Sequence, residues 1–513
     1  MKIQTKNKRK RAIMKVLFLY PNQRVMSLVP PSIGLLSSLL KNRGVKVELF
    51  DTSTYLIEGI DTDEIREQNL TVKPTKPDKK LKREKKDVFI ELNKKINEFK
   101  PDLIAVSATE STFLVGIKLL KTIKHKTLTI LGGVFATFAP EKAISYPEID
   151  IICVGEGEGA IVELCEKLSK NENYDNIKNL WIKKKDGTII KNKIRAPVNL
   201  DENPMIDFDI FDEKRLYRMM PDKSRNKVYK MLPIETHRGC PYMCGYCDSP
   251  TQNEIYWNQT HKKFFRTRSL DKVREEILYY TKKYKADYIF FWADTFFTYS
   301  KEEIDKFCEM YKDINLPFYA QARPETITDY KVKRLKEVGL HRMGIGIEHG
   351  NEKFRREILN RYYTNKQLIN SLKIVEKHKI PFSVNNIIGL PDETPQLVMD
   401  TIEINRRIPT ADSTGCSIFQ PYHGTKLREL SIKRGYITDD VIAPTNADSS
   451  ILNMPNFPKE RIAGLARTFN MYVRFPKSRW NEIKIAEQFT PEGNVMWKKL
   501  RKEFMSKFFG SGE

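Results

Sequence analysis

Short apolar runs alternate with amphipathic helical patterns along most of the chain, and this alternation limits the folds that it can adopt. The first stretch contains five such runs, at Lys15–Tyr20, Val45–Phe50, Leu103–Ser107, Leu128–Leu131 and Ile149–Val154. Near-continuous Val, Ile and Leu strands separated by helices indicate a parallel sheet that is covered on both faces. We therefore predict an α/β fold that begins with a doubly wound, Rossmann-like parallel sheet.

The alternation resumes in the second half of the chain. Six further apolar runs occur, at Met231–Thr236, Tyr288–Trp292, Phe318–Gln321, Arg342–Glu348, Phe382–Ile388 and Gly415–Gln420. Six strand–helix repeats predict a partial (β/α)6 barrel, in which reactive groups belong at the carboxyl ends of the strands. Helical patterns at Arg461–Phe475 and Val495–Phe508 predict a helical C-terminal region.

These patterns divide the chain into five segments. We predict a disordered basic leader, a first sheet domain, a hairpin with a linker, the partial barrel and the helical region, at residues 1–13, 14–170, 171–229, 230–429 and 430–513. The hairpin is expected at Leu180–Ile190, with Asp186 and Gly187 as a two-residue turn. A lysine-rich run, Lys73–Lys86, is expected to be a solvated insertion in the first domain.

Three closely spaced cysteines follow the first predicted barrel strand. Cys240, Cys244 and Cys247 have the spacing Cys-x3-Cys-x2-Cys. Three thiolates on one loop can hold three irons of a four-iron cubane and leave the fourth iron open. The alternative is a zinc site with His237 as the fourth ligand, although this is not a usual finger spacing. Disulfides are disfavoured because seven cysteines are a low and odd count, and no secretory leader is recognised.

The chain is strongly basic, with a net charge of +23. The excess is mostly lysine spread along the sequence, which favours a solvated surface over a nucleic-acid site. No stretch approaches the ~20 apolar residues of a membrane span. We expect a cytoplasmic protein with no membrane span and no nucleic-acid partner, in a reducing compartment that suits an iron–sulfur cluster.

The cysteine run resembles the signature of radical S-adenosylmethionine (SAM) enzymes, with Tyr246 as the aromatic residue before the last cysteine. The resemblance implies a [4Fe–4S] cluster whose open iron chelates the methionine part of SAM, and reductive cleavage of SAM to a 5′-deoxyadenosyl radical. The SAM contacts that it implies are Tyr246, Asp294, Gln321, Arg323, Glu348 and Gly389. Two histidines, His349 and His423, could reach the substrate, although a lone histidine is more often structural.

The first domain resembles the cobalamin-binding (B12-binding) domain that precedes many radical SAM cores. The matching segments are Pro30–Gly34, Gly44–Asp51, Leu131–Thr137 and Val154–Glu158. The cobalamin contacts that the resemblance implies are Ser107, Thr109, Gly132, Gly133 and Val134. No G-x-G-x-x-G follows the first strand, which argues against a dinucleotide site. The loop from Tyr20 to Pro31 has no histidine, so cobalamin would lack a lower histidine ligand from that loop.

The two resemblances together predict a cobalamin-dependent radical SAM methyltransferase that acts on an unactivated carbon through the deoxyadenosyl radical and methylcobalamin. Three alternatives remain open: a cyclisation or rearrangement with the same cofactors, a radical SAM RNA-modifying enzyme, and a cobalamin-binding sensor without catalysis. The expected partners are a small-molecule, lipid or sugar substrate and an electron donor such as flavodoxin or ferredoxin. No catalytic residue is predicted.

Overall fold

The computed structural model describes residues 13–24, 27–57, 62–72, 84–221, 226–447 and 449–510. The predicted leader, except for residue 13, and most of the lysine-rich insertion lie outside these residues. The chain folds as two compact units. Unit 1 consists of Met1–Asn22, Pro30–Tyr55 and Glu84–Asp212, and unit 2 consists of Gln23–Val29, Leu56–Arg83 and Glu213–Glu513. No helix in the described part of the chain is long and apolar enough to cross a membrane.

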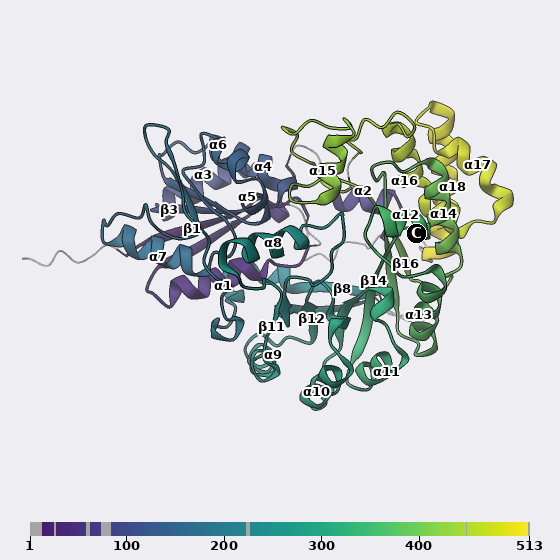
Figure 1. Cartoon of the computed structure of the whole chain (residues 1–513), viewed down its shortest axis with the longest axis horizontal. Coiled ribbons are helices and arrows are strands. Elements are labelled where there is room, and N and C mark those ends of the chain that lie inside the picture. Colours follow the sequence, from purple (N-terminus) through teal and green to yellow (C-terminus); the bar gives the residue numbers. More distant parts are fainter. Residues whose placement is uncertain are drawn as a thin grey trace, which may run out of the picture. The chain divides into compact units, whose positions relative to one another are not determined.

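Unit 1 is built around one seven-stranded sheet with the order β2-β1-β3-β4-β5-β6-β7. The strands are β1 (Lys15–Tyr20), β2 (Lys46–Asp51), β3 (Leu103–Ser107), β4 (Leu128–Gly132), β5 (Ile151–Cys153), β6 (Leu180–Lys183) and β7 (Ile189–Lys191). Strands β1 to β5 are parallel, as predicted, and β6 and β7 are antiparallel. The helices of this unit are α1 (Pro31–Lys41), α3 (Val88–Phe99), α4 (Glu110–Lys121), α5 (Val134–Phe138), α6 (Pro140–Ser145) and α7 (Glu158–Ser169) (Figure 1).

The hairpin β6–β7 differs from its prediction in two respects. It extends the first sheet through β5 rather than standing apart. Its loop has three residues, because Lys184 N–H donates to Thr188 O and Gly187 N–H donates to Lys184 O. The predicted two-residue turn is therefore wrong: Gly187 takes a φ of +86°, the left-handed conformation that closes a three-residue loop after a tight turn.

Unit 2 contains the second seven-stranded sheet, with the order β16-β15-β14-β13-β12-β9-β8. The six predicted barrel strands are β9 (Asn226–Glu235), β12 (Tyr288–Trp292), β13 (Phe318–Ala322), β14 (Leu340–Glu348), β15 (Phe382–Ile388) and β16 (Ser413–Ile418), and all six run parallel. The edge strand β8 (Tyr217–Pro221) is antiparallel and lies within the predicted linker. The predicted fold class is confirmed.

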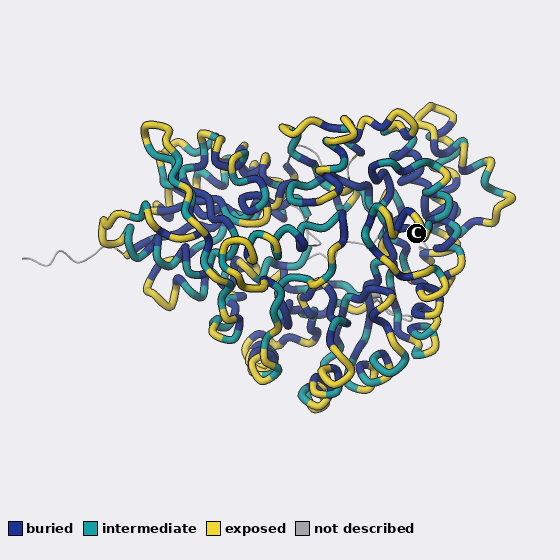
Figure 2. The backbone as a smooth tube through the Cα atoms, viewed as in Figure 1, coloured by how far each residue is buried: buried dark blue, intermediate teal, exposed yellow. Residues whose placement is uncertain are grey.

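Helices cover the outer face of this curved sheet (Figure 1). They are α9 (Leu270–Tyr284), α10 (Lys301–Tyr311), α11 (Asp329–Glu337), α13 (Asn365–Lys377) and α14 (Pro395–Arg406). Phe291 of β12 packs edge-on against Phe307 of α10, with ring centroids 5.3 Å apart, and both side chains are fully buried. The burial map shows the same layering, with dark strands inside and yellow helix faces outside (Figure 2).

The C-terminal helices close one side of the sheet in unit 2. They are α16 (Lys459–Arg474), α17 (Trp480–Ala486) and α18 (Pro491–Phe504), and their apolar faces join the core around Ile402 and Leu465. A segment from near the N-terminus joins them. It includes α2 (Thr62–Gln68), and Leu70 O accepts a hydrogen bond from Asn470 Nδ2 of α16 at 3.1 Å. Hydrophobic periodicity did not predict this excursion of the chain.

Candidate functional site

The cysteine loop follows β9. Backbone contacts fix its start and its middle. The two-residue strand β10 (His237–Arg238) pairs with β11 (Arg266–Thr267), and α8 (Ser249–Thr260) begins two residues after Cys247. Between them, Gly245 N–H donates to Leu359 O at 3.1 Å, and Gly245 O accepts from Leu427 N–H at 2.9 Å. A Cβ atom on Gly245 would lie 2.8 Å from Ile358 O. The close approach therefore requires glycine at this position of the loop.

The thiols of the loop are chemically suited to bind a metal cluster. All three cysteines are free. Burial raises the pKa of Cys240 to about 11 and that of Cys247 to about 12. Alone, these two thiols would stay protonated at neutral pH, whereas bound iron deprotonates a coordinating thiol. Three soft sulfur donors on one fixed loop fit an iron–sulfur cluster.

The geometry does not support the zinc alternative. In the part of the chain that the structure describes, no group of three or more His, Cys, Asp or Glu side chains is arranged to hold a metal ion. His237 is 2% exposed and lies between the rings of Phe265 and Tyr299, with centroids 5.7 Å away on each side. Burial lowers its pKa to about 4. In a cubane, by contrast, each thiolate binds a different iron and the sulfurs need not converge on one point.

Tyr246 of the cysteine loop forms a hydrogen-bonded triad with two buried side chains, Glu348 and Arg361. Glu348 Oε1 accepts hydrogen bonds from Tyr246 Oη at 3.0 Å and from Arg361 NH1 at 2.7 Å, and Arg361 NH1 also lies 2.9 Å from Tyr246 Oη. Glu348 ends β14 with a φ of +60°, which is uncommon for a residue other than glycine and marks many functional sites. The triad joins the loop residue Tyr246 to the barrel strand β14.

Arg361 is the member of this triad that the sequence analysis missed. Its side chain is 2% exposed, and its Nε and NH2 atoms have no hydrogen-bond partner within the described residues. Buried polar groups normally find a partner, so two buried donors without one are uncommon. Arg361 lies in the loop after α12 (Glu352–Glu357), and no local pattern distinguishes it from other arginines.

Arg323 lies at the carboxyl end of β13 and contacts the cysteine loop directly. Its NH1 atom is 2.8 Å from Cys244 Sγ, and its Nε donates to Glu325 Oε1 at 2.7 Å. The guanidinium also covers the Tyr242 ring, 3.8 Å from the centroid. Arg323 therefore places positive charge beside Cys244, a predicted cluster ligand, and a salt bridge to Glu325 also holds it.

The remaining predicted SAM contacts on the strands occupy different surroundings. Gln321 of β13 is half-buried. Asp294, which follows β12, is exposed. The protein around its carboxylate still removes enough water to raise its pKa. The pKa of Cys240 is raised mainly by burial, and the charge of Asp294 adds to that shift.

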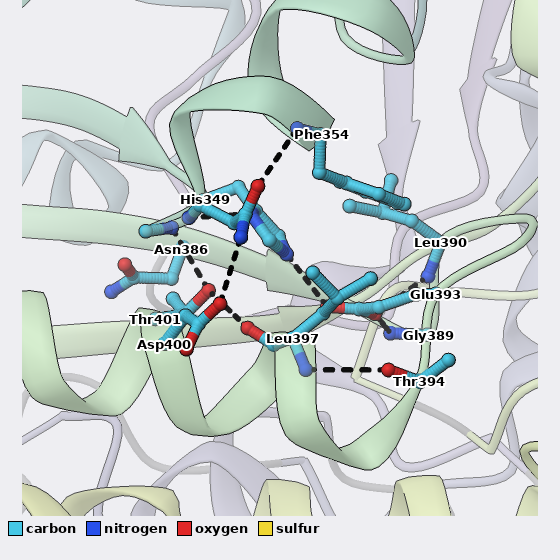
Figure 3. Close-up of polar contacts among 12 residues, drawn as sticks. His349, Phe354, Asn386, Gly389, Leu390, Glu393, Thr394, Leu397, Asp400 and Thr401 are labelled. Atoms are coloured by element: carbon cyan, nitrogen blue, oxygen red, sulfur yellow. Dashed lines mark hydrogen bonds and ion pairs between the residues drawn. The ribbon is translucent and has the colours of Figure 1, made fainter. Parts of the chain in front are cut away.

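Gly389 belongs to a separate buried network at the end of β15 (Figure 3). The Glu393 carboxylate accepts from the backbone N–H groups of Gly389 and Leu390 at 2.5 and 3.0 Å, and lies 3.0 Å from His349 Nε2. Asn351 N–H donates to His349 Nδ1 at 3.1 Å, so the ring proton is on Nε2 and points to Glu393. His349 is 0% exposed. Of the two roles considered for His349, the structural one fits this geometry, because its ring supports the Gly389 turn.

The predicted cobalamin contacts of unit 1 lie together at the carboxyl ends of two neighbouring strands. Ser107 ends β3 opposite Gly132 of β4, and Thr109, Gly133 and Val134 follow these two strands. Gly133 has a φ of +105°. A Cβ atom there would lie 2.4 Å from the backbone oxygen of Ala108, the residue after β3. A Cβ on Gly132 would meet no atom within 4 Å. This open edge, with Thr109 and Val134 exposed, fits a bulky planar ligand.

Comparisons with known proteins agree with both halves of this description. Residues 234–404 match the radical SAM superfamily, and residues 82–165 match the B12 binding domain. An uncharacterized methyltransferase of Pyrococcus horikoshii is 27% identical over 80% of this chain and 86% of its own length. Cytidylyl-2-hydroxyethylphosphonate methyltransferase of Streptomyces wedmorensis is 21% identical over 92% of this chain and 93% of its own length.

A solved structure shows the same fold. The radical SAM methyltransferase TsrM from Kitasatospora setae, with cobalamin and a [4Fe–4S] cluster bound, superposes with a TM-score of 0.64 and 15% identity, covering 96% of this chain and 99% of TsrM. The chain belongs to the radical SAM superfamily and carries a B12-binding domain. It is a radical SAM enzyme, and the cofactors of its two domains are a [4Fe–4S] cluster, SAM and cobalamin.

Proposed function

We propose that the protein is a cobalamin-dependent radical SAM methyltransferase that methylates an unactivated carbon of a small molecule. The observation that carries the proposal is the presence in one chain of a fixed three-cysteine loop and an open glycine edge on a B12-binding sheet. The two methyltransferase relatives align with 80% and 92% of the chain, which supports methyl transfer over other radical reactions. In this proposal residues 14–170 bind cobalamin and residues 230–429 form the radical SAM core.

The chain's own residues would hold the cofactors as follows. Cys240, Cys244 and Cys247 bind the cluster, and Arg323 stabilises the negative charge of the Cys244 thiolate. Arg361 would hold Glu348 and Tyr246 in place beside the cluster loop through its NH1 atom. When bound, the cluster and SAM supply a hydrogen-abstracting radical, and cobalamin supplies methyl-transfer chemistry.

Two further groups of residues would shape the SAM site. Tyr246, held by Glu348, and Asp294 and Gln321 at the strand ends complete the proposed SAM contacts. Glu393 holds the turn at Gly389, so that this backbone presents a constant surface to SAM. An external electron donor would reduce the cluster, because the described residues offer no second cluster of cysteines.

Product analysis tests the proposal. The protein is reconstituted anaerobically with iron, sulfide and cobalamin, reduced, and incubated with SAM, and both nucleoside products are quantified. Formation of 5′-deoxyadenosine together with S-adenosylhomocysteine, the by-product of any methyl transfer from SAM, supports it. 5′-Deoxyadenosine without S-adenosylhomocysteine would instead indicate a rearrangement or cyclisation.

Two cysteine variants, one a test and the other its matched control, check the assignment of the cluster. Cys244→Ala is expected to lose the iron–sulfur chromophore and 5′-deoxyadenosine formation, because it removes one of three cluster ligands. Cys308→Ala, which alters a buried cysteine of α10 on the outer side of the sheet, is expected to keep both. Equal activity of the two variants would contradict the assignment of the cluster.

A further inference from the structure

Helices cover the outer face of the barrel sheet in unit 2, and strand alternation identifies the side chains of its inner face. The outer face of β12 is fixed by Phe291, which packs on α10. Because successive side chains of a strand point to opposite faces, Phe290 and Trp292 lie on the inner face. In the parallel register Phe290 is opposite Tyr319 of β13, so Tyr319 lies on the inner face as well.

These three rings form what we call the aromatic wall: Phe290, Trp292 and Tyr319. Phe290 and Tyr319 stack with centroids 4.7 Å apart and planes at 13°, and the Phe290 and Trp292 centroids are 6.0 Å apart. Trp292, the last residue of β12, is 42% exposed. At the start of β12, this face is filled by the buried side chains of Tyr229, Met231 and Tyr288.

The opposite part of the inner face carries small and uncharged polar residues. The register of β13 to β16 places Gly344, Ser383, Asn385 and Gly415 there. A Cβ on Gly344 would lie within 3 Å of the Tyr319 ring and closer still to its hydroxyl, so glycine leaves the space that this ring occupies. Asn385 is exposed on this face and offers an uncharged donor and acceptor.

The arginines that β13 and β14 contribute to this face are already paired with carboxylates. The two arginines at inner-face positions, Arg323 and Arg342, are paired with Glu325 and Asp412 at 2.5 and 2.6 Å. An anionic group placed against the aromatic wall would therefore have no unpaired arginine of these strands to neutralise it. Desolvating an anion without such a partner is costly.

We propose that the aromatic wall binds an uncharged, planar, conjugated ring of the substrate, and that Asn385 hydrogen-bonds its polar edge. Flat rings gain offset stacking and buried area against Phe290 and Trp292, which a puckered aliphatic ring of similar size gains less well. The inference rests on the proposed function only in taking this inner face as the substrate site.

Binding of three matched probes tests this substrate class on the anaerobic holoenzyme without turnover. The probes are 2-naphthol, its saturated counterpart decahydro-2-naphthol, and naphthalene-2-sulfonate, and binding is measured by equilibrium dialysis. We expect 2-naphthol to bind about tenfold more tightly than either of the others. Equal binding of the flat and saturated alcohols, or tighter binding of the sulfonate, would overturn the proposal.

Two tryptophan variants locate the probe. Trp292→Leu is expected to weaken 2-naphthol binding about three- to tenfold through the lost ring contact. Trp257→Leu, which removes a tryptophan of α8 that is 54% exposed, is expected to leave binding unchanged. If both variants bind 2-naphthol as the unaltered protein does, the aromatic wall is not its site. Because no turnover is needed, this result stands apart from the product analysis that tests methyl transfer.

Discussion

The network around Glu393 predicts that a single change of one oxygen to nitrogen will destabilise unit 2. The carboxylate of Glu393 receives three hydrogens, from Gly389 N–H, Leu390 N–H and His349 Nε2–H. In Glu393→Gln the side chain has nearly the same shape, but one acceptor oxygen is replaced by an NH2 donor. Whichever way the amide is turned, that donor faces at least one N–H group.

The histidine cannot relieve this conflict by moving its proton. If the proton shifts to Nδ1, it meets the N–H of Asn351, which now donates to that atom. His349 and Glu393 have side chains that are 0% exposed, so water does not satisfy the orphaned groups. A lost hydrogen bond to a charged group costs about 1.5–3 kcal/mol. We therefore expect the free energy of unfolding to fall by about 2–3 kcal/mol.

Urea titration of the cofactor-free protein, followed by near-UV circular dichroism, measures this loss. With an m-value of about 3 kcal/mol per molar urea, the midpoint of the unfolding transition should fall by about 0.7–1 M. Glu403→Gln, on the helix α14 that follows Glu393 and with a side chain 42% exposed, is the matched control and should change stability by less than about 0.5 kcal/mol. Equal midpoints for the two variants would refute the three-donor arrangement.

Three further predictions concern the cysteine loop and its surroundings. Because burial holds the pKa of His237 near 4, below the ~6.5 of an unfolded histidine, its stabilising contribution is complete above pH 6.5 and is lost as pH falls toward 4. The loss amounts to about 3 kcal/mol, and His237→Phe should abolish this part of the pH dependence of urea unfolding. Gly245→Ala should lower the iron bound per chain after reconstitution, because its Cβ meets a backbone carbonyl at 2.8 Å, whereas Gly157→Ala, with no atom closer than 3.8 Å, should bind iron normally. Arg361→Met should cost about 3–5 kcal/mol by leaving Glu348 buried without its cation, and adding Glu348→Gln should restore more than half of that loss; no restoration would show that the pair is not coupled.

Several features of the protein could be predicted from local sequence because their physical causes are local. Apolar periodicity over five to seven residues placed β1, β3, β12 and β15 within one residue of their observed bounds. The three cysteines lie within eight residues, so their spacing alone indicated a cluster-binding loop. The glycines after β4 indicated close backbone approach, and one of them adopts a positive φ.

Other features depend on contacts between residues far apart in the chain, and no local pattern encodes them. Arg361 reaches Tyr246 across 115 positions, and Asn470 reaches Leu70 across 400. His349 is polar in sequence but becomes a buried support once Glu393 folds back against it. The sequence by itself determined the strands and the thiolates, because apolar alternation and cysteine spacing act over a few residues. The tertiary structure alone decided which charges meet, since burial pairs a charge with whatever the fold brings within hydrogen-bond distance.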